Sequence, residues 1–344
     1  MHKEKHIIRA WEEHFKDRGI SSDLIVQYTT YIKKLSENDL PIIFEIEHLS
    51  LLIGINLPSL RKIINAPEKF YRTFSIPKRR GGEREISAPL PSLLACQDWI
   101  YKNLLAKISI HDSAHGFVPG RSILTNASPH LAQKALLKMD LKNFFPSIPI
   151  NWVMKLFSDF GYANNVAFYL ASICCLNESL AQGSATSPYL SNILVKGLDK
   201  RLKALSDSYH LEYTRYADDL TFSGNYIPHT FPSTVEEIVS DFGLEVNIEK
   251  TRLHTKPGQR IVTGISVAGA TPSLPRASKR QIRQEAHFIQ KYGLISHISK
   301  KKIRAPTYID SIEGKLAFWL QVEPNNEFAR ESLSHIRKIR RDHQ

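Results

Sequence analysis

Hydrophobic spacing divides the chain into an N-terminal helical part and a longer part that mixes strands with helices. Amphipathic spacing at 7–15 and 23–35 predicts two helices, and Asp39-Leu40-Pro41 ends that pattern. Residues 73–76 and 84–87 then flank a glycine-containing turn, which is the pattern of two strands joined by a tight connection.

The centre of the chain continues the alternation of strands and helices. The apolar run 135–140 predicts a buried strand that ends in Asp140. Two further strand patterns, 211–215 and 220–223, are joined through Ala217-Asp218-Asp219. The other expected elements are helices at about 94–108, 151–175, 188–205 and 233–242, and one strand at about 260–266.

The C-terminal part is expected to be helical. Residues 269–275 are typical of a linker, and helical patterns cover 279–292, 307–322 and 327–341. Together these patterns predict an α+β protein, and a length of 344 residues favours about two domains.

Charge is distributed unevenly along the chain, whose formal net charge is +12. Residues 1–65 hold nine basic and nine acidic residues, whereas 276–344 hold fifteen basic and seven acidic ones. A basic C-terminal region suggests a phosphate-backbone partner, and a solvated helical face is the alternative.

Targeting signals are not apparent. The first twenty residues do not resemble a signal peptide, and no apolar run reaches the roughly 18 residues that a membrane span needs. Cys96, Cys174 and Cys175 lack metal-ligand spacing. We expect buried thiols, a cytoplasmic location and no membrane partner.

Three carboxylates are candidates for chemistry: Asp140 at a strand end, and Asp218 and Asp219 at a hairpin turn. Two-metal phosphoryl transfer uses carboxylates that hold two Mg²⁺ ions about 3.5–4 Å apart. An Asp-Asp pair is also common in turns for local hydrogen bonding. Here strand formers flank the pair, and metal binding would relieve the repulsion between neighbouring charges.

Three other segments suit a nucleotide. Lys78, Arg79, Arg80 and Arg84 form a basic hairpin suited to a triphosphate, with a solvated hairpin as the alternative. Gln182-Gly183-Ser184 lets the backbone approach a substrate, although it is also an ordinary helix-start turn. For Phe144 and Phe145, core packing is the simplest interpretation.

The sequence resembles the reverse transcriptases over roughly residues 65–325. The resemblance rests on four segments in the family's order and spacing. They are Lys138-Met-Asp140-Leu-Lys-Asn-Phe-Phe145 for motif A, Ala181-Gln-Gly-Ser-Ala-Thr-Ser-Pro188 for motif B, Tyr216-Ala-Asp-Asp219 for motif C and Gly243-Leu-Glu-Val-Asn-Ile-Glu-Lys250-Thr for motif D.

The resemblance implies a role for each matching residue. Asp140, Asp218 and Asp219 would bind two catalytic Mg²⁺ ions, with the Leu141 carbonyl as an added ligand. Phe145 would be the gate that excludes ribonucleotides. Lys78 and Arg84 would hold the triphosphate, Gln182 would contact the nucleotide or template, and Lys250 would protonate the pyrophosphate.

Two short signatures resemble those of the bacterial retron enzymes. Asn126-Ala-Ser-Pro-His130 is similar to the retron Asn-Ala-x-x-His motif, and Val262-Thr263-Gly264 is similar to the Val-Thr-Gly motif. A core histidine and a core strand are the simpler interpretations of each. With Arg280 and Arg283 of the basic C-terminal region, these residues are the expected RNA contacts.

The retron resemblance implies a specific reaction and a set of partners. The enzyme would copy a cognate structured noncoding RNA from deoxynucleoside triphosphates, starting at a guanosine 2′-hydroxyl and yielding branched RNA–DNA (msDNA). It would act in anti-phage defence with a separate effector protein. Since we find no RNase H carboxylate set, a host RNase H would remove template RNA. We also find no Cys/His-rich endonuclease tail, which weakens a group II intron interpretation.

The implied fold is a right-hand polymerase with an antiparallel palm sheet packed on helices. We expect an N-terminal helical extension at 1–65, fingers at 66–135, a palm at 136–268 with finger-associated helices at about 150–180, and a basic helical thumb at 269–344. Two alternatives remain. One is another bacterial reverse transcriptase, of the group II-like or abortive-infection type; the other is an RNA-binding scaffold that no longer polymerises.

Overall fold

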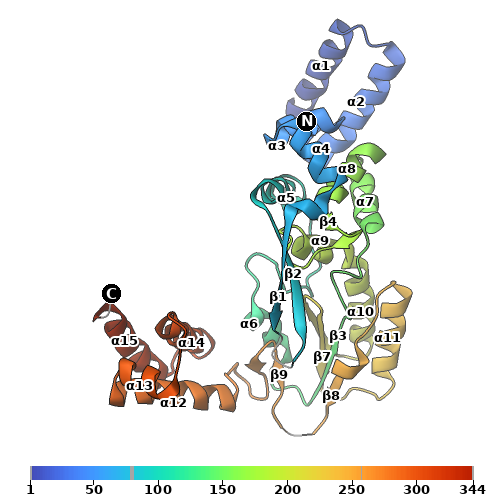
Figure 1. Cartoon of the computed structure of the whole chain (residues 1–344). Coiled ribbons are helices and arrows are strands. Elements are labelled where there is room, and N and C mark those ends of the chain that lie inside the picture. Colours follow the sequence, from blue (N-terminus) through green and yellow to red (C-terminus); the bar gives the residue numbers. More distant parts are fainter. Residues whose placement is uncertain (1, 78–80, 257, 343–344) are drawn as a thin grey trace. The chain divides into compact units, whose positions relative to one another are not determined.

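The computed structural model describes residues 2–77, 81–256 and 258–342 (Figure 1). The chain forms two compact units, each assembled from separate stretches of sequence. The first contains residues 1–117, 141–201 and 238–246, and the second contains 118–140, 202–237 and 247–344. The domain boundaries expected from the sequence remain predictions.

The first unit begins with four helices: α1 (His2–Asp17), α2 (Ser22–Glu37), α3 (Ile46–Ile53) and α4 (Leu57–Asn65). The two expected helices are confirmed as α1 and α2, which pack around Phe15, Ile25 and Ile32. The side chain of Asn56 begins α4 by accepting a hydrogen bond from the Ser59 amide, which satisfies a free donor of the first turn.

The rest of the first unit is a hairpin with helices. Strands β1 (Tyr71–Pro77) and β2 (Glu83–Pro89) pair antiparallel from Tyr71↔Pro89 to Pro77↔Glu83, which confirms the expected strand pair. The helices that follow are α5 (Pro91–Asn103), α7 (Ile150–Asp159), α8 (Asn164–Cys174) and α9 (Ser187–Leu194). The short strands β4 (Cys175–Leu176) and β5 (Ser179–Leu180) form a second hairpin.

The second unit is built on a four-stranded antiparallel sheet in the order β6-β7-β3-β8. Its strands are β6 (Glu212–Tyr216), β7 (Asp219–Gly224), β3 (Ala135–Asp140) and β8 (Arg252–His254). Leu136, Leu137 and Met139 are buried, as the apolar run predicted for β3. The short helix α6 (Ile123–Ala127) and the 3₁₀ turn η3 (Ser128–His130) contact β6.

Two sequence-based expectations were wrong. The single helix expected at 188–205 is two helices, α9 and α10 (Lys196–Ser208), because Val195 leaves helical geometry at φ −90°, ψ 9°. The single strand expected near 260–266 is a hairpin of β9 (Ile261–Val262) and β10 (Ile265–Ser266). Helix α11 (Phe231–Asp241) confirms the helix expected near 233–242.

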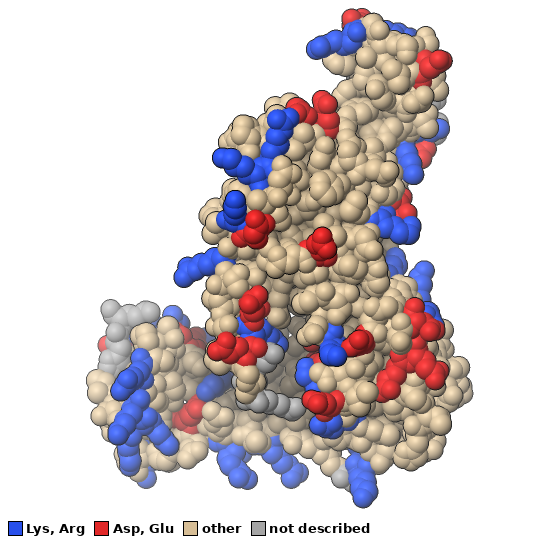
Figure 2. Space-filling view, turned by 45° about the vertical axis from the view of Figure 1, so that its right-hand side comes forward, with Lys and Arg blue, Asp and Glu red and all other residues tan. Residues whose placement is uncertain are grey.

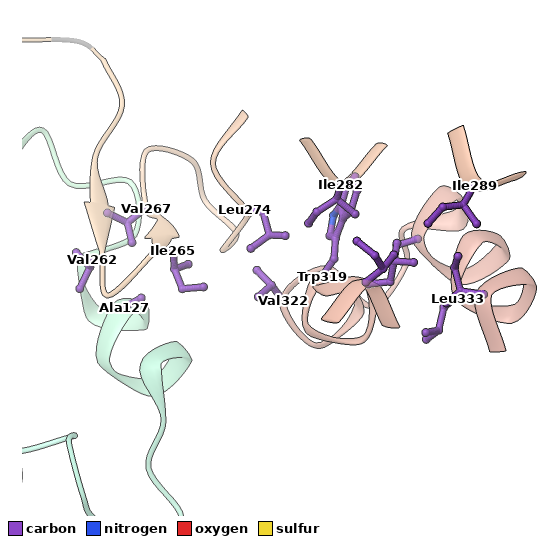
Figure 3. Packing of buried hydrophobic residues seen from close by; sticks show 14 of the residues in the cluster. Ala127, Val262, Ile265, Val267, Leu274, Ile282, Ile289, Trp319, Val322 and Leu333 are labelled. Carbon is purple, nitrogen blue, oxygen red and sulfur yellow. The ribbon is translucent and has the colours of Figure 1, made fainter. Parts of the chain in front are cut away.

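The C-terminal helices form a bundle within the second unit: α12 (Arg276–Tyr292), α13 (Leu294–Lys301), α14 (Tyr308–Val322) and α15 (Glu327–Asp342). Three were expected, and α13 was not. Trp319 is fully buried in an apolar cluster that also contains Val262, Ile265 and Leu274. Figure 3 shows Leu274 between the β9–β10 side chains and those of the helices. Buried apolar contact therefore joins the hairpin to the bundle.

The three cysteines are buried and free, which confirms the expectation of buried thiols. Among the described residues, no helix combines the length and apolar character needed to cross a membrane.

Candidate active site

Strand register brings two of the predicted carboxylates together. Asp140 ends β3 and Asp219 begins β7, and their Cα atoms are direct partners in the antiparallel ladder. Directly opposed residues point their side chains to the same face of a sheet. Asp218 precedes Asp219 in the turn that joins β6 to β7. All three candidate carboxylates therefore lie at one end of the sheet.

The turn that carries Asp218 is tight and strained. Tyr216 pairs with Asp219, so only Ala217 and Asp218 lie between the strands. Ala217 has φ +56°, a conformation that typically costs an alanine about 1–3 kcal/mol. The buried Arg215 guanidinium donates a hydrogen bond of 3.1 Å to the Ala217 carbonyl and so supports the turn from beneath. Sequence reasoning missed Arg215, because an arginine in a strand pattern is normally assigned to the solvent-facing side.

Burial and neighbouring negative charge raise the pKa of two of the carboxylates, Asp218 and Asp219. Burial raises the pKa of Asp218 to about 6, and the charges of Asp219 and Asp140 contribute to the rise. Burial also raises the pKa of Asp219, while Lys138 opposes the rise and Asp140 adds to it. Negative charge is therefore concentrated here beyond what the surrounding protein compensates, which is the condition that a bound cation relieves.

Lys250 supplies the most direct compensation. Its Nζ lies 2.7 Å and 2.9 Å from the two carboxylate oxygens of Asp140. The same segment is held in place through the main chain, since the Asn247 amide donates to the Asp140 carbonyl at 2.7 Å. The structure thus places the predicted Lys250 beside the predicted metal ligand Asp140, with the ammonium on the carboxylate.

The carboxylate oxygens of Asp140, Asp218 and Asp219 are suitable ligands for divalent cations. In this structure, however, the three side chains are not arranged as a metal site. Among the described residues, no three His, Cys, Asp or Glu side chains stand close enough to hold a metal ion. Carboxylate oxygens are nevertheless the hard donors that Mg²⁺ prefers. Leu141, whose carbonyl was the fourth predicted ligand, follows Asp140 directly and is buried.

The predicted triphosphate residues belong to the β1–β2 hairpin of the first unit. Arg84 lies on β2 opposite Ile76 and its side chain is exposed. Lys78, Arg79 and Arg80 lie outside the described residues. The structure therefore locates one of the two predicted triphosphate contacts on a solvent-facing strand.

Gln182 and Gly183 form a loop that packs tightly on β2. The Ser87 amide donates to the Gln182 carbonyl at 2.8 Å. A Cβ at Gly183, where φ is +121°, would lie 2.6 Å from the Ser87 carbonyl oxygen, so only glycine fits. Gln97 on α5, which sequence reasoning missed, is buried and accepts a hydrogen bond from the Ala185 amide at 3.1 Å. This hydrogen bond helps to hold the same loop in place.

Phe145 lies in an aromatic group of the first unit. Its ring stacks on Phe144 with centroids 5.6 Å apart and lies 6.1 Å from the ring of Phe117. Phe144 is buried, as the core interpretation predicted, whereas Phe145 is half-buried. The Phe145 ring thus packs near two other rings and is still partly accessible.

His130 lies in the interior of the second unit. Its Nδ1 is 2.6 Å from the Ser223 hydroxyl on β7, and its Nε2 is 2.8 Å from the Thr214 hydroxyl on β6. The imidazole is fully buried. It therefore connects two neighbouring strands of the sheet, and the direct RNA contact expected for it stays a prediction.

Val262-Thr263-Gly264 is a hairpin turn. Val262 pairs with Ile265, and the two residues between them, Thr263 and Gly264, have φ +45° and +87°. Positive φ at both positions defines a type I′ turn, which favours glycine at the second. The Thr263 hydroxyl donates to the Ile123 carbonyl at 3.1 Å.

The two short signatures contact each other. The Asn126 side-chain amide lies 3.4 Å from the Thr263 hydroxyl, although 137 residues separate them in sequence. Asn126 is fully buried, and its Oδ1 has no hydrogen-bond partner among the described residues. The signatures therefore form one structural unit where β9–β10 meets α6.

Arg280 and Arg283 are both exposed on α12, yet their surroundings differ. The Arg283 guanidinium lies 5.5 Å from the Trp319 ring centroid and 5.4 Å from that of Phe328, so it packs as well as carries charge.

Comparison with known proteins identifies the family. Residues 76–302 match the family described as reverse transcriptase (RNA-dependent DNA polymerase). The chain is 36% identical to the retron Mx65 reverse transcriptase of Myxococcus xanthus, over 74% of this chain and 65% of that protein. It is 33% identical to the retron Ec86 reverse transcriptase of Escherichia coli, over 82% of this chain and 93% of that protein.

Other similarities are weaker or partial. The retron Mx162 reverse transcriptase of Myxococcus xanthus is 32% identical, over 81% of this chain and 64% of that protein. The chain thus spans slightly less than two thirds of both Myxococcus proteins. A solved telomerase from Candida albicans aligns with 78% of this chain and 63% of its own, with a TM-score of 0.43 and 12% identity. From the family match and the retron relatives, the chain belongs to the reverse transcriptases, which are RNA-dependent DNA polymerases, and within them to the bacterial retron enzymes.

Proposed function

We propose that this reverse transcriptase copies part of a cognate structured noncoding RNA into DNA, using Asp140, Asp218 and Asp219 as its catalytic carboxylates. The observation that carries the proposal is the pairing of Asp140 with Asp219 across β3 and β7, beside the strained turn that carries Asp218. In the right-hand polymerase fold of this family, that sheet is the palm and the C-terminal helices are the thumb.

The carboxylates would hold two Mg²⁺ ions, with the Leu141 carbonyl as a further ligand. Bound there, the ions would activate the attacking hydroxyl and stabilise the leaving pyrophosphate. To bind a metal ion, the Asp140 carboxylate would have to give up its hydrogen bonds with the Lys250 ammonium, which involve both of its oxygens. Lys250, once released, is free to donate a proton to the pyrophosphate.

The nucleotide would be bound by residues of the first unit. Arg84 and Lys78 would contact the triphosphate of a deoxynucleotide, and Gln182 would contact the nucleotide or template. Phe145 would exclude the ribose 2′-hydroxyl, since its ring is backed by Phe144 and Phe117 and cannot easily retreat.

The retron relationship supports a proposal for the RNA partner and the priming reaction. We infer that synthesis starts from a guanosine 2′-hydroxyl and yields branched RNA–DNA, and that the enzyme serves anti-phage defence in the cytoplasm. A separate effector protein and a host RNase H would complete the system. The excess of basic residues in 276–344, fifteen against seven acidic ones, supports an RNA-binding role for the thumb.

The test is to express the chain with its neighbouring noncoding RNA, purify the protein and analyse the nucleic acid that it retains. We expect DNA joined to RNA, released as two strands by debranching enzyme and shortened by both DNase and RNase. A matched protein with Asp218→Asn and Asp219→Asn should retain RNA and lack DNA. RNA alone from the unaltered protein would refute the polymerase proposal and leave the RNA-binding scaffold. Linear DNA would refute the branched product only.

A further inference from the structure

The thumb contains a cavity of about 420 Å³ between α12, α13 and α14. Gln281, Gln284 and Phe288 line it from α12. These positions are three, four and seven residues apart, so they share one face of the helix. His297 on α13 and Tyr308 on α14 line the other side. None of the roles assigned above uses these residues.

Four aromatic rings form a stack beside this cavity. Phe288 stacks on Tyr292 at an interplanar angle of 27° and on His297 at 17°, and His297 stacks on Tyr308 at 24°. Successive centroids lie 5.8–5.9 Å apart. The His297 Nε2 and the Tyr308 hydroxyl are also within hydrogen-bonding distance, at 3.0 Å. The rings are therefore held nearly parallel, and three of the four face the cavity.

Apart from Ile303, the remaining lining is polar and can hydrogen-bond to the edge of a base. Glu285 is engaged by Lys315 at 2.8 Å and by the Gln281 amide at 3.0 Å, so its charge is compensated within the bundle. The exposed side chain of Gln284 makes no hydrogen bond to another described residue in 2–77, 81–256 and 258–342. Its amide is thus available as both donor and acceptor.

The charge around the cavity selects the class of partner. Residues 276–304 contain nine basic residues and one acidic residue. In Figure 2, Lys and Arg side chains gather over the C-terminal helices on the face turned to the viewer. The larger cavity of the N-terminal helices, about 710 Å³, is also aromatic, but Glu45 and Glu47 line it and no described lysine or arginine does. Of these two cavities, the thumb cavity is the one that combines rings with a surface that attracts phosphates.

We infer that the thumb cavity binds an unpaired nucleobase of the RNA, which extends the stack of rings and hydrogen-bonds to Gln284. Unpaired bases in loops and bulges are commonly read by stacking on aromatic side chains together with polar contacts to their edges. This inference rests on the proposed function, because it assigns the thumb's RNA recognition to one cavity.

The test compares two RNA probes by fluorescence anisotropy: a short unstructured oligoadenylate and a blunt duplex of equal length. Phe288→Ala should weaken binding of the single strand by about tenfold, the scale of one base–aromatic stack. Gln284→Ala should weaken it by about threefold, the scale of one hydrogen bond. Duplex binding should change by less than about twofold, because backbone contacts are untouched. Tyr226→Ala, which removes an exposed ring outside the cavity, should change neither.

Two controls separate this inference from the proposed function and from misfolding. Asp218→Asn should lose extension of a DNA primer annealed to an RNA template and keep RNA affinity, whereas Phe288→Ala should lose affinity for the single strand. Gln284 is exposed, so its substitution should leave the melting temperature unchanged. Equal weakening of both probes, or unchanged single-strand binding in both cavity variants, overturns the inference. In the second case a protein segment becomes the better candidate occupant.

Discussion

Asp140 and Asp219 are placed by main-chain pairing between β3 and β7, whereas Phe288 and Gln284 are carried by a helix that side-chain packing holds in place. A strand ladder determines the positions of its side chains through backbone hydrogen bonds, so a substitution at Asp140 changes chemistry and leaves the frame. The thumb cavity has no such frame, and its function is spread over several side chains. The palm should therefore respond to single substitutions with large effects, and the thumb with small, additive ones.

The largest expected effect tests the palm side of this comparison. Asp140→Asn removes the charge that we propose binds metal while keeping the shape of the side chain, so primer extension should fall by about a thousandfold or more. RNA affinity should stay within about twofold, because no thumb residue changes. The measurement is single-turnover extension at saturating Mg²⁺, with RNA binding by anisotropy in parallel. Retention of more than a tenth of the activity would remove Asp140 from the catalytic set.

An intermediate effect is expected at His130. Substituting this residue tests whether the retron signature around it stabilises the fold or contacts RNA. His130→Ala leaves the buried Ser223 and Thr214 hydroxyls without the imidazole as a partner and opens a cavity. The free energy of unfolding should fall by about 2–4 kcal/mol. Urea denaturation measures it, and His335→Ala on the exposed face of α15 is the matched control. Unchanged stability with reduced RNA affinity would show instead that His130 acts on RNA directly.

The smallest effects are expected at the thumb arginines. Arg280→Gln removes charge alone, so the slope of log affinity against log salt should decrease by about 0.7 for each phosphate that the side chain no longer neutralises, with unchanged stability. Arg283→Gln should in addition lower the free energy of unfolding by about 0.5–1 kcal/mol, because its guanidinium also packs over Trp319 and Phe328. Salt titrations of RNA binding and urea denaturation check the pair. Identical behaviour of the two variants would contradict the packing role of Arg283.

Local pattern was sufficient for the elements that carry the carboxylates. The apolar run before Asp140 and the strand formers around Asp218 and Asp219 predicted β3, β6 and β7, and the structure confirms these strands. The hydrophobic pattern failed to predict element boundaries at which only one or two residues change the direction of the backbone. The Thr263-Gly264 turn was included in a strand, and Val195 was included in a helix, because neither interrupts the hydrophobic spacing enough to be read as a boundary.

Residues whose importance comes from burial were not visible in sequence. By residue type, Arg215 and Gln97 are ordinary polar residues. Each is important for the fold because its buried side chain hydrogen-bonds to a main-chain group of a loop, the Ala217 carbonyl and the Ala185 amide respectively. His130 was predicted as an RNA contact on motif resemblance, and only the structure shows its two hydroxyl partners.

The sequence by itself determined the family and the order of its motifs, and it singled out three candidate carboxylates, because motifs and strand periodicity can be read from the chain without its tertiary contacts. The tertiary structure decided which distant segments meet. It paired Asp140 with Asp219, brought Lys250 onto Asp140 across 110 residues, and joined Asn126 to Thr263 across 137. It also gathered Phe288, His297 and Tyr308 around one cavity. Periodicity shows which face of an element is buried, whereas register and partner depend on packing among all elements together.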